Sequence, residues 1–158
     1  MPGAPIPEVG QLAPDFRLRG PGGSWITLSE HRGHGAVVLV FYPQAFSPTC
    51  AHQLPELQAA LPRFEAVGAT VYGVSVDSHW TNTAFARSLG LSFPLLSDWK
   101  REASAAFGVL LPEPGYSDRA TFVISRDGRV SWREISEQRG SLDKLPSVEA
   151  ALAAAAGA

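Results

Sequence analysis

The stretch Phe41-Tyr42-Pro43-Gln44-Ala45-Phe46-Ser47-Pro48-Thr49-Cys50 follows the most apolar run of the chain and predicts a corner between a strand and a helix. Ser47 is a favourable N-cap residue, because its hydroxyl can accept a hydrogen bond from an amide of the first helical turn. Pro48 suits the first helical position, where a missing N–H is tolerated. Cys50 then occupies the third helical position, near the positive end of the helix dipole, which favours the thiolate over the thiol.

Two interpretations of Cys50, the only cysteine of the chain, are open at this point. A lone cysteine is commonly a small buried hydrophobic residue with no chemical role. A thiolate at a helix N-terminus is instead a nucleophile. The apolar strand and the capping pattern before it favour the second interpretation.

The composition is that of an ordinary globular protein. The chain has 158 residues, of which 45% are hydrophobic and 18% are charged, and we expect one domain spanning residues 1–158. Thirteen Lys and Arg against fifteen Asp and Glu give a formal charge of −2, which offers no electrostatic basis for binding nucleic acid or an anionic membrane. No signal peptide or membrane span is expected, and a single cysteine is consistent with a reducing cytoplasm.

Strand and helix patterns alternate on both sides of the corner. Residues 36–42 and 70–76 are apolar, β-branched runs typical of buried strands, and a helix is expected between them from Pro48 to about Val67, with a kink or restart at Pro55. The other expected elements are a hairpin of 15–19 and 24–28, a helix over 81–89, a strand over 93–96, a helix over 100–107, a hairpin of 119–125 and 129–135, and a helix over 142–156.

This order of elements predicts an α/β fold. We expect a central mixed β-sheet flanked by helices on both faces and extended by the N-terminal β-hairpin. The two buried strands and the helix between them form a right-handed βαβ unit. In such sheets, functional sites gather beyond the carboxyl ends of the strands, which is where Cys50 falls.

The spacing of Pro43, Ser47 and Cys50 resembles the motif of the peroxiredoxin family (alkyl hydroperoxide reductase and thiol-specific antioxidant proteins), which has a thioredoxin-like fold. Three further segments resemble the family in the same order along the chain, and they are Val74-Ser75-Val76-Asp77-Ser78, Phe93-Pro94-Leu95-Leu96-Ser97-Asp98 and Arg119-Ala120-Thr121-Phe122-Val123-Ile124. The one-Cys members of the alkyl hydroperoxide reductase E and bacterioferritin-comigratory branches look most similar.

The resemblance implies a thiol-dependent peroxidase. Cys50 would attack a hydroperoxide and become a sulfenic acid. Ser47 would hold the peroxide in line, and Arg119 would stabilise the negative charge. Pro43 would shield the site from water, and Gln53 would orient the arginine. No cofactor and no metal are implied.

Each of these four supporting residues also has a simpler interpretation. Ser47 could act only as the N-cap, and Pro43 could simply end its strand. Without the resemblance, Arg119 reads as an exposed charge at a strand end, and Gln53 as a solvated helix residue. It is their joint placement in the family motif that favours the catalytic roles.

A second, resolving cysteine, which many peroxiredoxins carry, is absent from this chain. One common position for it, five residues after the first cysteine, is Pro55, and the following helix offers only Ser78 and Ser88. The sulfenic acid would therefore be reduced by an external thiol, either a low-molecular-weight thiol or a thioredoxin- or glutaredoxin-like protein. A second subunit's Cys50 is a further option, and a homodimer is compatible with the family.

The remaining motifs point to little chemistry. His31 and His34 have a metal-like spacing but lie among glycines in a turn, where we expect them to be solvated. The four tryptophans, at positions 25, 80, 99 and 132, are interpreted as core or rim packing, and an exposed one could help a dimer face. Two functions compete with the peroxidase: a peroxide sensor that relays oxidation to a partner protein, and a redox-inactive interaction module.

Overall fold

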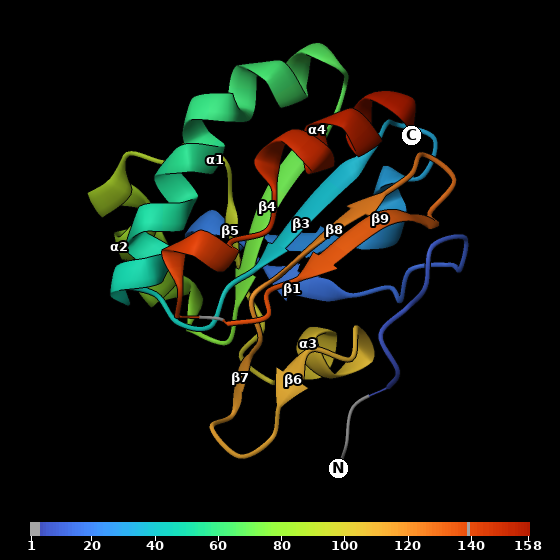
Figure 1. Ribbon diagram of the computed structural model, residues 1–158. Coiled ribbons are helices and arrows are strands. Elements are labelled where there is room, and N and C mark those ends of the chain that lie inside the picture. The colour runs from blue at the N-terminus through green and yellow to red at the C-terminus, as the bar shows by residue number, and fades with distance from the viewer. Residues whose placement is uncertain (1–3, 139) are drawn as a thin grey trace.

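The computed structural model describes residues 4–138 and 140–158, and their centre is a seven-stranded mixed sheet with the strand order β2-β1-β5-β4-β3-β8-β9 (Figure 1). The strands are β1 (Arg17–Arg19), β2 (Trp25–Thr27), β3 (Val37–Phe41), β4 (Thr70–Ser75), β5 (Leu95–Ser97), β6 (Leu110–Leu111), β7 (Tyr116–Ser117), β8 (Ala120–Ile124) and β9 (Val130–Ile135). The α-helices are α1 (Pro48–Ala66), α2 (His79–Leu89), α3 (Glu102–Ala106) and α4 (Val148–Gly157).

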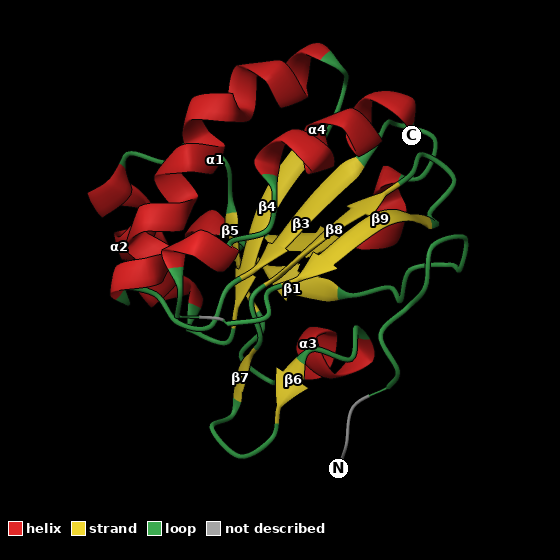
Figure 2. Ribbon diagram, in the orientation of Figure 1, coloured by secondary structure: helices red, strands yellow, loops and turns green. Residues whose placement is uncertain are grey.

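Helices cover the two faces of the sheet unequally (Figure 2). On one face, α1, α2 and α4 pack through residues such as Leu54, Phe85 and Ala151 against the side chains of Val38 and Val40. On the other face, the short helix α3 and the N-terminal segment cover a second core that includes the remaining residues of β3. Strand β3 is thus buried on both faces, which is why its sequence is apolar throughout and does not alternate.

The pairing of the strands confirms the predicted α/β architecture. β3 pairs in parallel with β4, and β4 in parallel with β5, while β8 lies antiparallel to β3 on its other side. The predicted N-terminal hairpin forms β1 and β2, and β1 extends the sheet beside β5 through the pairing of Arg19 with Ser97. The carboxyl ends of β3, β4 and β5 therefore lie at one edge of the sheet, where α1 begins.

Helix α1 runs without a break through Pro55, so of the two effects expected of this proline, a kink or a restart, the restart does not occur. The expected start of the final helix is wrong. The final helix does not begin at Leu142, because Pro146 holds the preceding residue Leu145 in an extended conformation. A single 3-10 turn at 142–144 comes first, and α4 starts only after Ser147, whose side chain accepts a hydrogen bond from the amide of Ala150.

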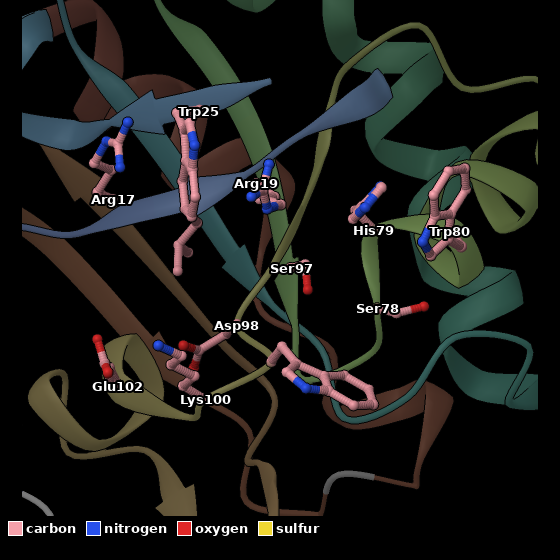
Figure 3. A pocket seen from close by; sticks show the side chains of 12 residues that line it. Arg17, Arg19, Trp25, Ser78, His79, Trp80, Ser97, Asp98, Lys100 and Glu102 are labelled. Atoms are coloured by element: carbon pink, nitrogen blue, oxygen red, sulfur yellow. The ribbon is translucent and has the colours of Figure 1, made fainter. Parts of the chain in front are cut away.

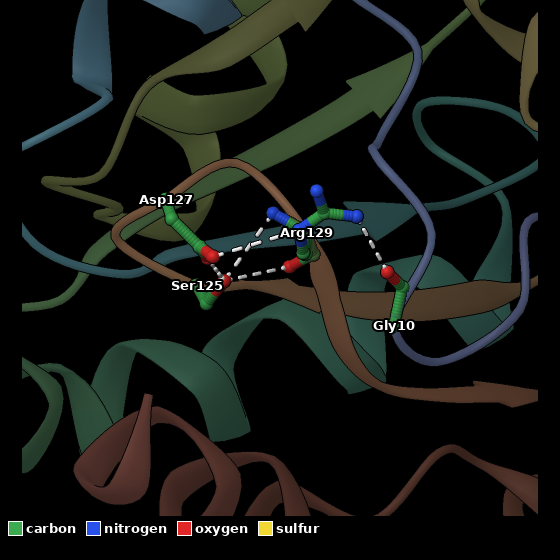
Figure 4. A network of polar contacts seen from close by, with 4 residues as sticks. All are labelled: Gly10, Ser125, Asp127 and Arg129. Carbon is green, nitrogen blue, oxygen red and sulfur yellow. Dashed lines mark hydrogen bonds and ion pairs between the residues drawn. The ribbon is translucent and has the colours of Figure 1, made fainter.

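The predicted turn at Asp127-Gly128 joins β8 and β9 (Figure 4). The Ser125 hydroxyl donates to the carboxylate of Asp127, and this hydrogen bond is the largest cause that lowers the pKa of that exposed carboxyl. Arg129 spans the gap to the N-terminal segment, with Nη1 donating to the carbonyl of Gly10 at 2.9 Å. Because these contacts lie at the edge of the sheet opposite the start of α1, this turn offers control positions for mutagenesis.

Candidate active site

Cys50 lies at the third position of α1, as the sequence predicts, and its side chain is fully buried (0% exposed). Ser47 is the N-cap residue, with the extended backbone angles of a cap (φ −71°, ψ 147°). Its hydroxyl, however, makes no capping hydrogen bond, so this part of the prediction is wrong. The Ser47 side chain is therefore not engaged in holding the helix terminus.

One arginine joins the sulfur to the neighbouring turn of the helix. Arg119 donates from Nη2 to Cys50 Sγ at 3.3 Å and from Nη1 to Gln53 Oε1 at 2.5 Å. Gln53 lies on the same face of α1 as Cys50, one turn further along. The two ends of one planar guanidinium thus bind the thiol and its supporting amide, so the group is positioned to stabilise negative charge on the sulfur.

Strand pairing explains how a residue 69 positions from Cys50 reaches it. β8 runs beside β3, with Ala120 opposite Phe41, so Arg119 lies next to the loop that leads into α1. Arg119 is only 2% exposed, which excludes the interpretation as a solvated strand-end charge. Gln53 is also buried, so it is not a solvated helix residue. A buried guanidinium requires polar partners, and the sulfur and the amide oxygen supply two of them.

Pro43 is buried at the beginning of the loop between β3 and α1. The residue before it, Tyr42, is fixed at both ends. Its amide donates to the carbonyl of Val74 at 3.0 Å, and its hydroxyl donates to Asn82 Oδ1 at 2.7 Å. Burial raises the pKa of Tyr42 well above its ordinary value, which keeps the hydroxyl protonated as a donor.

Asp77 anchors the middle of the same loop, a role that the sequence does not predict beyond placing the residue in a family segment. Its Oδ2 accepts a hydrogen bond from the amide of Ala45 at 2.8 Å and another from the hydroxyl of Ser75, also at 2.8 Å. The loop also contains Phe46, which has a positive φ of 66° and packs against Phe85 at 4.9 Å between ring centroids. A non-glycine residue with this backbone needs surrounding contacts to hold it.

We expect Asp77→Ala to slow the oxidation of Cys50 by hydrogen peroxide about ten- to a hundred-fold, because a loose loop misplaces the reacting groups. Stopped-flow tryptophan fluorescence measures the rate. Asp77→Asn retains an acceptor oxygen and should recover most of it. The control Asp127→Ala removes an exposed carboxylate at the opposite edge of the sheet and should leave the rate unchanged. Equal rates in Asp77→Ala and the wild type would contradict an anchoring role.

His31 and His34 have the spacing of metal ligands, and the structure shows what surrounds His31. His31 Nε2 lies 2.8 Å from the hydroxyl of Tyr72, so this half-buried residue is not simply solvated as predicted. Burial lowers the pKa of His31, which favours the neutral ring. In the described part of the chain, no group of three or more His, Cys, Asp or Glu side chains is arranged to hold a metal ion.

The tryptophans are predicted from the sequence to pack in the core or at its rim, and burial in the core is wrong for three of the four. Trp25, Trp80 and Trp99 are exposed, whereas Trp132 is partly buried against the core beside α4. Trp25 and Trp80 lie at the beginning of β2 and α2, and Trp99 lies in the turn after β5, so none of them is inside a long periodic segment that would predict its burial.

Residues 9–133 match the model of a protein family described as the AhpC/TSA family. The chain belongs to the AhpC/TSA family. It is thus a peroxiredoxin, an oxidoreductase of the thiol-dependent peroxidase type. This confirms the resemblance drawn from the motif around Cys50.

Similar proteins come from both of the branches that the sequence resembles, the alkyl hydroperoxide reductase E branch and the bacterioferritin-comigratory branch. Alkyl hydroperoxide reductase E of Mycobacterium tuberculosis is 39% identical over 132 residues, which cover 82% of this chain and 86% of the relative. Peroxiredoxin Bcp of Xanthomonas campestris is 35% identical over 129 residues, covering 77% and 80%. The crystal structure of peroxidoxin BcpB from Mycobacterium tuberculosis aligns with a TM-score of 0.84 at 30% identity and covers 96% of this chain and 97% of that one. These similarities confirm the thioredoxin-like fold.

Among the described residues of this peroxiredoxin, no helix is both long enough and apolar enough to cross a bilayer.

Proposed function

We propose that this peroxiredoxin reduces hydrogen peroxide and organic hydroperoxides by a one-Cys mechanism with Cys50 as the nucleophile. The observation that carries the proposal is the hydrogen bond from Arg119 Nη2 to Cys50 Sγ, in a site where both side chains are buried. The guanidinium places a fixed positive charge beside the sulfur, where it stabilises the negative charge that the sulfur carries when it attacks.

The first half of the reaction oxidises the cysteine. The Cys50 thiolate attacks the terminal oxygen of the hydroperoxide, so that an S–O bond forms while the O–O bond breaks. The cysteine becomes a sulfenic acid, and the leaving oxygen takes up a proton and departs as water or an alcohol. Arg119 stabilises the charge that develops on that oxygen, and Gln53 fixes the direction of the guanidinium.

Ser47 and Pro43 complete the proposed site. The hydroxyl of Ser47 is not used to cap α1, which makes it available to hold the peroxide in line with the sulfur. Pro43 is buried and adds an apolar wall that limits the access of water to the sulfenic acid.

The second half of the reaction regenerates Cys50. Because Cys50 is the only cysteine of the chain, we assign this half to an external thiol. The thiol attacks the sulfenic sulfur, water leaves, and a mixed disulfide forms, which a second thiol then exchanges to release the Cys50 thiol. A low-molecular-weight thiol and a thioredoxin- or glutaredoxin-like protein are the proposed reductants, and a reducing cytoplasm is the compartment that supplies them. A homodimer stays a prediction, which sedimentation velocity checks.

Stopped-flow mixing of the reduced protein with hydrogen peroxide and an organic hydroperoxide tests the proposal. We expect a tryptophan fluorescence change orders of magnitude faster than the oxidation of a free thiol, and an intact mass that grows by one oxygen atom. A rate no better than that of a free thiol would favour the redox-inactive module. Fast oxidation followed by poor turnover with every thiol would favour the sensor.

A further inference from the structure

Asn82 is a polar residue at a fully buried position of α2. It is 0% exposed, and it shares the buried face of the helix with Phe85, which lies three positions further on. Burying an amide is unfavourable unless its donor and acceptor groups are both paired, and an apolar side chain avoids this requirement. An asparagine at this position therefore indicates that its polar atoms have a role beyond packing.

The first turn of α2 is fixed so that Asn82 faces the sheet. The hydroxyl of Ser78 caps the helix by accepting a hydrogen bond from the amide of Thr81 at 3.1 Å. Ser97 holds the residue before this cap, because its hydroxyl donates to the carbonyl of Asp77 at 2.7 Å. Figure 3 shows the side chain of Ser97 at the end of β5, next to the segment that carries Ser78 into α2. The start of α2 is thus attached to the carboxyl ends of the strands.

The amide of Asn82 joins three neighbouring parallel strands. Its Oδ1 accepts a hydrogen bond at 2.7 Å from the hydroxyl of Tyr42, which follows β3, and lies 3.1 Å from the hydroxyl of Ser75, the last residue of β4. Its Nδ2 donates to the carbonyl of Leu96 in β5 at 3.2 Å. Because that carbonyl can only accept, Nδ2 must face it, and this directs Oδ1 to the two hydroxyls.

Both anchors of the loop between β3 and α1 meet at this amide. Tyr42 leads directly into the loop, and Asn82 holds its hydroxyl. Ser75, the second neighbour of Oδ1, donates to Asp77 Oδ2 at 2.8 Å. The same carboxylate oxygen accepts from the amide of Ala45 in the middle of the loop. Polar contacts therefore lead from one buried amide to both the beginning and the middle of the loop.

We propose that Asn82 is a positioning residue for the oxidation of Cys50. The inference rests on the proposed function, because it concerns the same reaction. Asn82 acts through Tyr42: by holding the hydroxyl it fixes the start of the loop that carries Pro43 and Ser47 of the proposed site. An in-line displacement depends on such placement, and a displacement of about 1 Å in the reacting groups can lower a rate about a hundred-fold.

Two apolar replacements remove the hydrogen bond between Asn82 and Tyr42 from either side. Asn82→Leu keeps most of the buried volume, and Tyr42→Phe removes only a hydroxyl. In peroxide consumption assays, we expect kcat/KM for hydrogen peroxide to fall at least about tenfold in Asn82→Leu and about three- to tenfold in Tyr42→Phe. The double variant should be no slower than Asn82→Leu, because both changes remove one interaction. Fully additive effects would contradict an action through Tyr42.

The separate turnover constants distinguish positioning from a loss of folded protein. Dithiothreitol is set at a concentration that limits turnover when peroxide is high, so kcat then reports the reduction of Cys50. In Asn82→Leu, kcat should stay close to the wild-type value while kcat/KM for hydrogen peroxide falls. A smaller number of folded molecules would lower both constants by the same factor, and that result would overturn the proposal.

Two variants serve as matched controls. Tyr72→Phe removes a hydroxyl that lies 2.8 Å from His31 Nε2, and Ser104→Ala removes a buried donor to Asp98 Oδ2. Both hydroxyls lie outside the polar contacts that lead from Asn82 to the loop, so both turnover constants should stay at their wild-type values. A fall in kcat/KM as large as that of Asn82→Leu in either control would overturn the proposal.

The outcomes separate this inference from the function on which it rests. If the wild type is an active peroxidase and Asn82→Leu has the same kcat/KM, the positioning role is wrong and the proposed function stands. If wild-type Cys50 is oxidised no faster than a free thiol, both are wrong. Circular dichroism checks folding, and should Asn82→Leu not fold, Tyr42→Phe decides: a wild-type kcat/KM in that variant would overturn the role of Asn82.

Discussion

Cys50→Ser is expected to lower hydroperoxide turnover by about 10³-fold or more, to the background rate of the thiol used as reductant. Serine has almost the shape of cysteine, so it should keep the packing of this buried position. It has no accessible anionic form at neutral pH, however, and Arg119 would face a neutral hydroxyl. The measurement is the consumption of hydrogen peroxide with dithiothreitol in excess.

The stability of the Cys50→Ser variant is the necessary control for this result. An unchanged urea midpoint together with the lost turnover would assign the loss to chemistry. Turnover retained in Cys50→Ser would contradict the mechanism, because the chain has no other thiol that could replace it.

Arg119→Met is expected to slow the oxidation of Cys50 by about 10²- to 10³-fold, the range found when one preorganised charge-stabilising donor is removed from an active site. Methionine fills much of the volume and carries no charge. It also deprives Gln53 Oε1 of a buried donor, which costs about 1–3 kcal/mol of stability. Stopped-flow fluorescence gives the rate, and urea unfolding gives the stability.

Two variants separate the charge of Arg119 from its geometry. Arg119→Lys keeps a positive charge but cannot bind the sulfur and Gln53 with one planar group, so we expect a rate between those of the methionine variant and the wild type. Arg129→Met removes an arginine at the opposite edge of the sheet and should not change the rate. An unchanged rate of Cys50 oxidation in Arg119→Met would contradict a catalytic role for Arg119.

The sequence predicts the local geometry around Cys50 well, because the determinants are close together. Pro48 and the preceding apolar strand define where α1 begins, and this fixes Cys50 at its third position. The hydroxyl of Ser47 shows the limit of such reasoning. A residue type that favours capping need not make the capping hydrogen bond, since other polar groups can satisfy the helix terminus.

Long-range contacts could not be derived from local patterns. The burial of Arg119 depends on β8 lying beside β3, and only the family resemblance suggested a role for it. The anchoring of Ala45 by Asp77 joins residues 32 positions apart. The three exposed tryptophans were missed for the opposite reason. Hydrophobic residues are normally assigned to the core, and nothing in a single sequence marks the few that remain in solvent.

The complete burial of the Cys50 sulfur sets a size limit on what can react with it. A hydroperoxide is small, but a thiol reductant must bring its own sulfur to about 2 Å in order to form a disulfide. The beginning of α1 must therefore open before the reductant can bind, and the hydrogen bond from Thr49 Oγ1 to the carbonyl of Gly140, at 3.2 Å, is one contact that must break. With a single cysteine in the chain, the alkylation rates of a small and a bulky reagent would report how often this opening occurs.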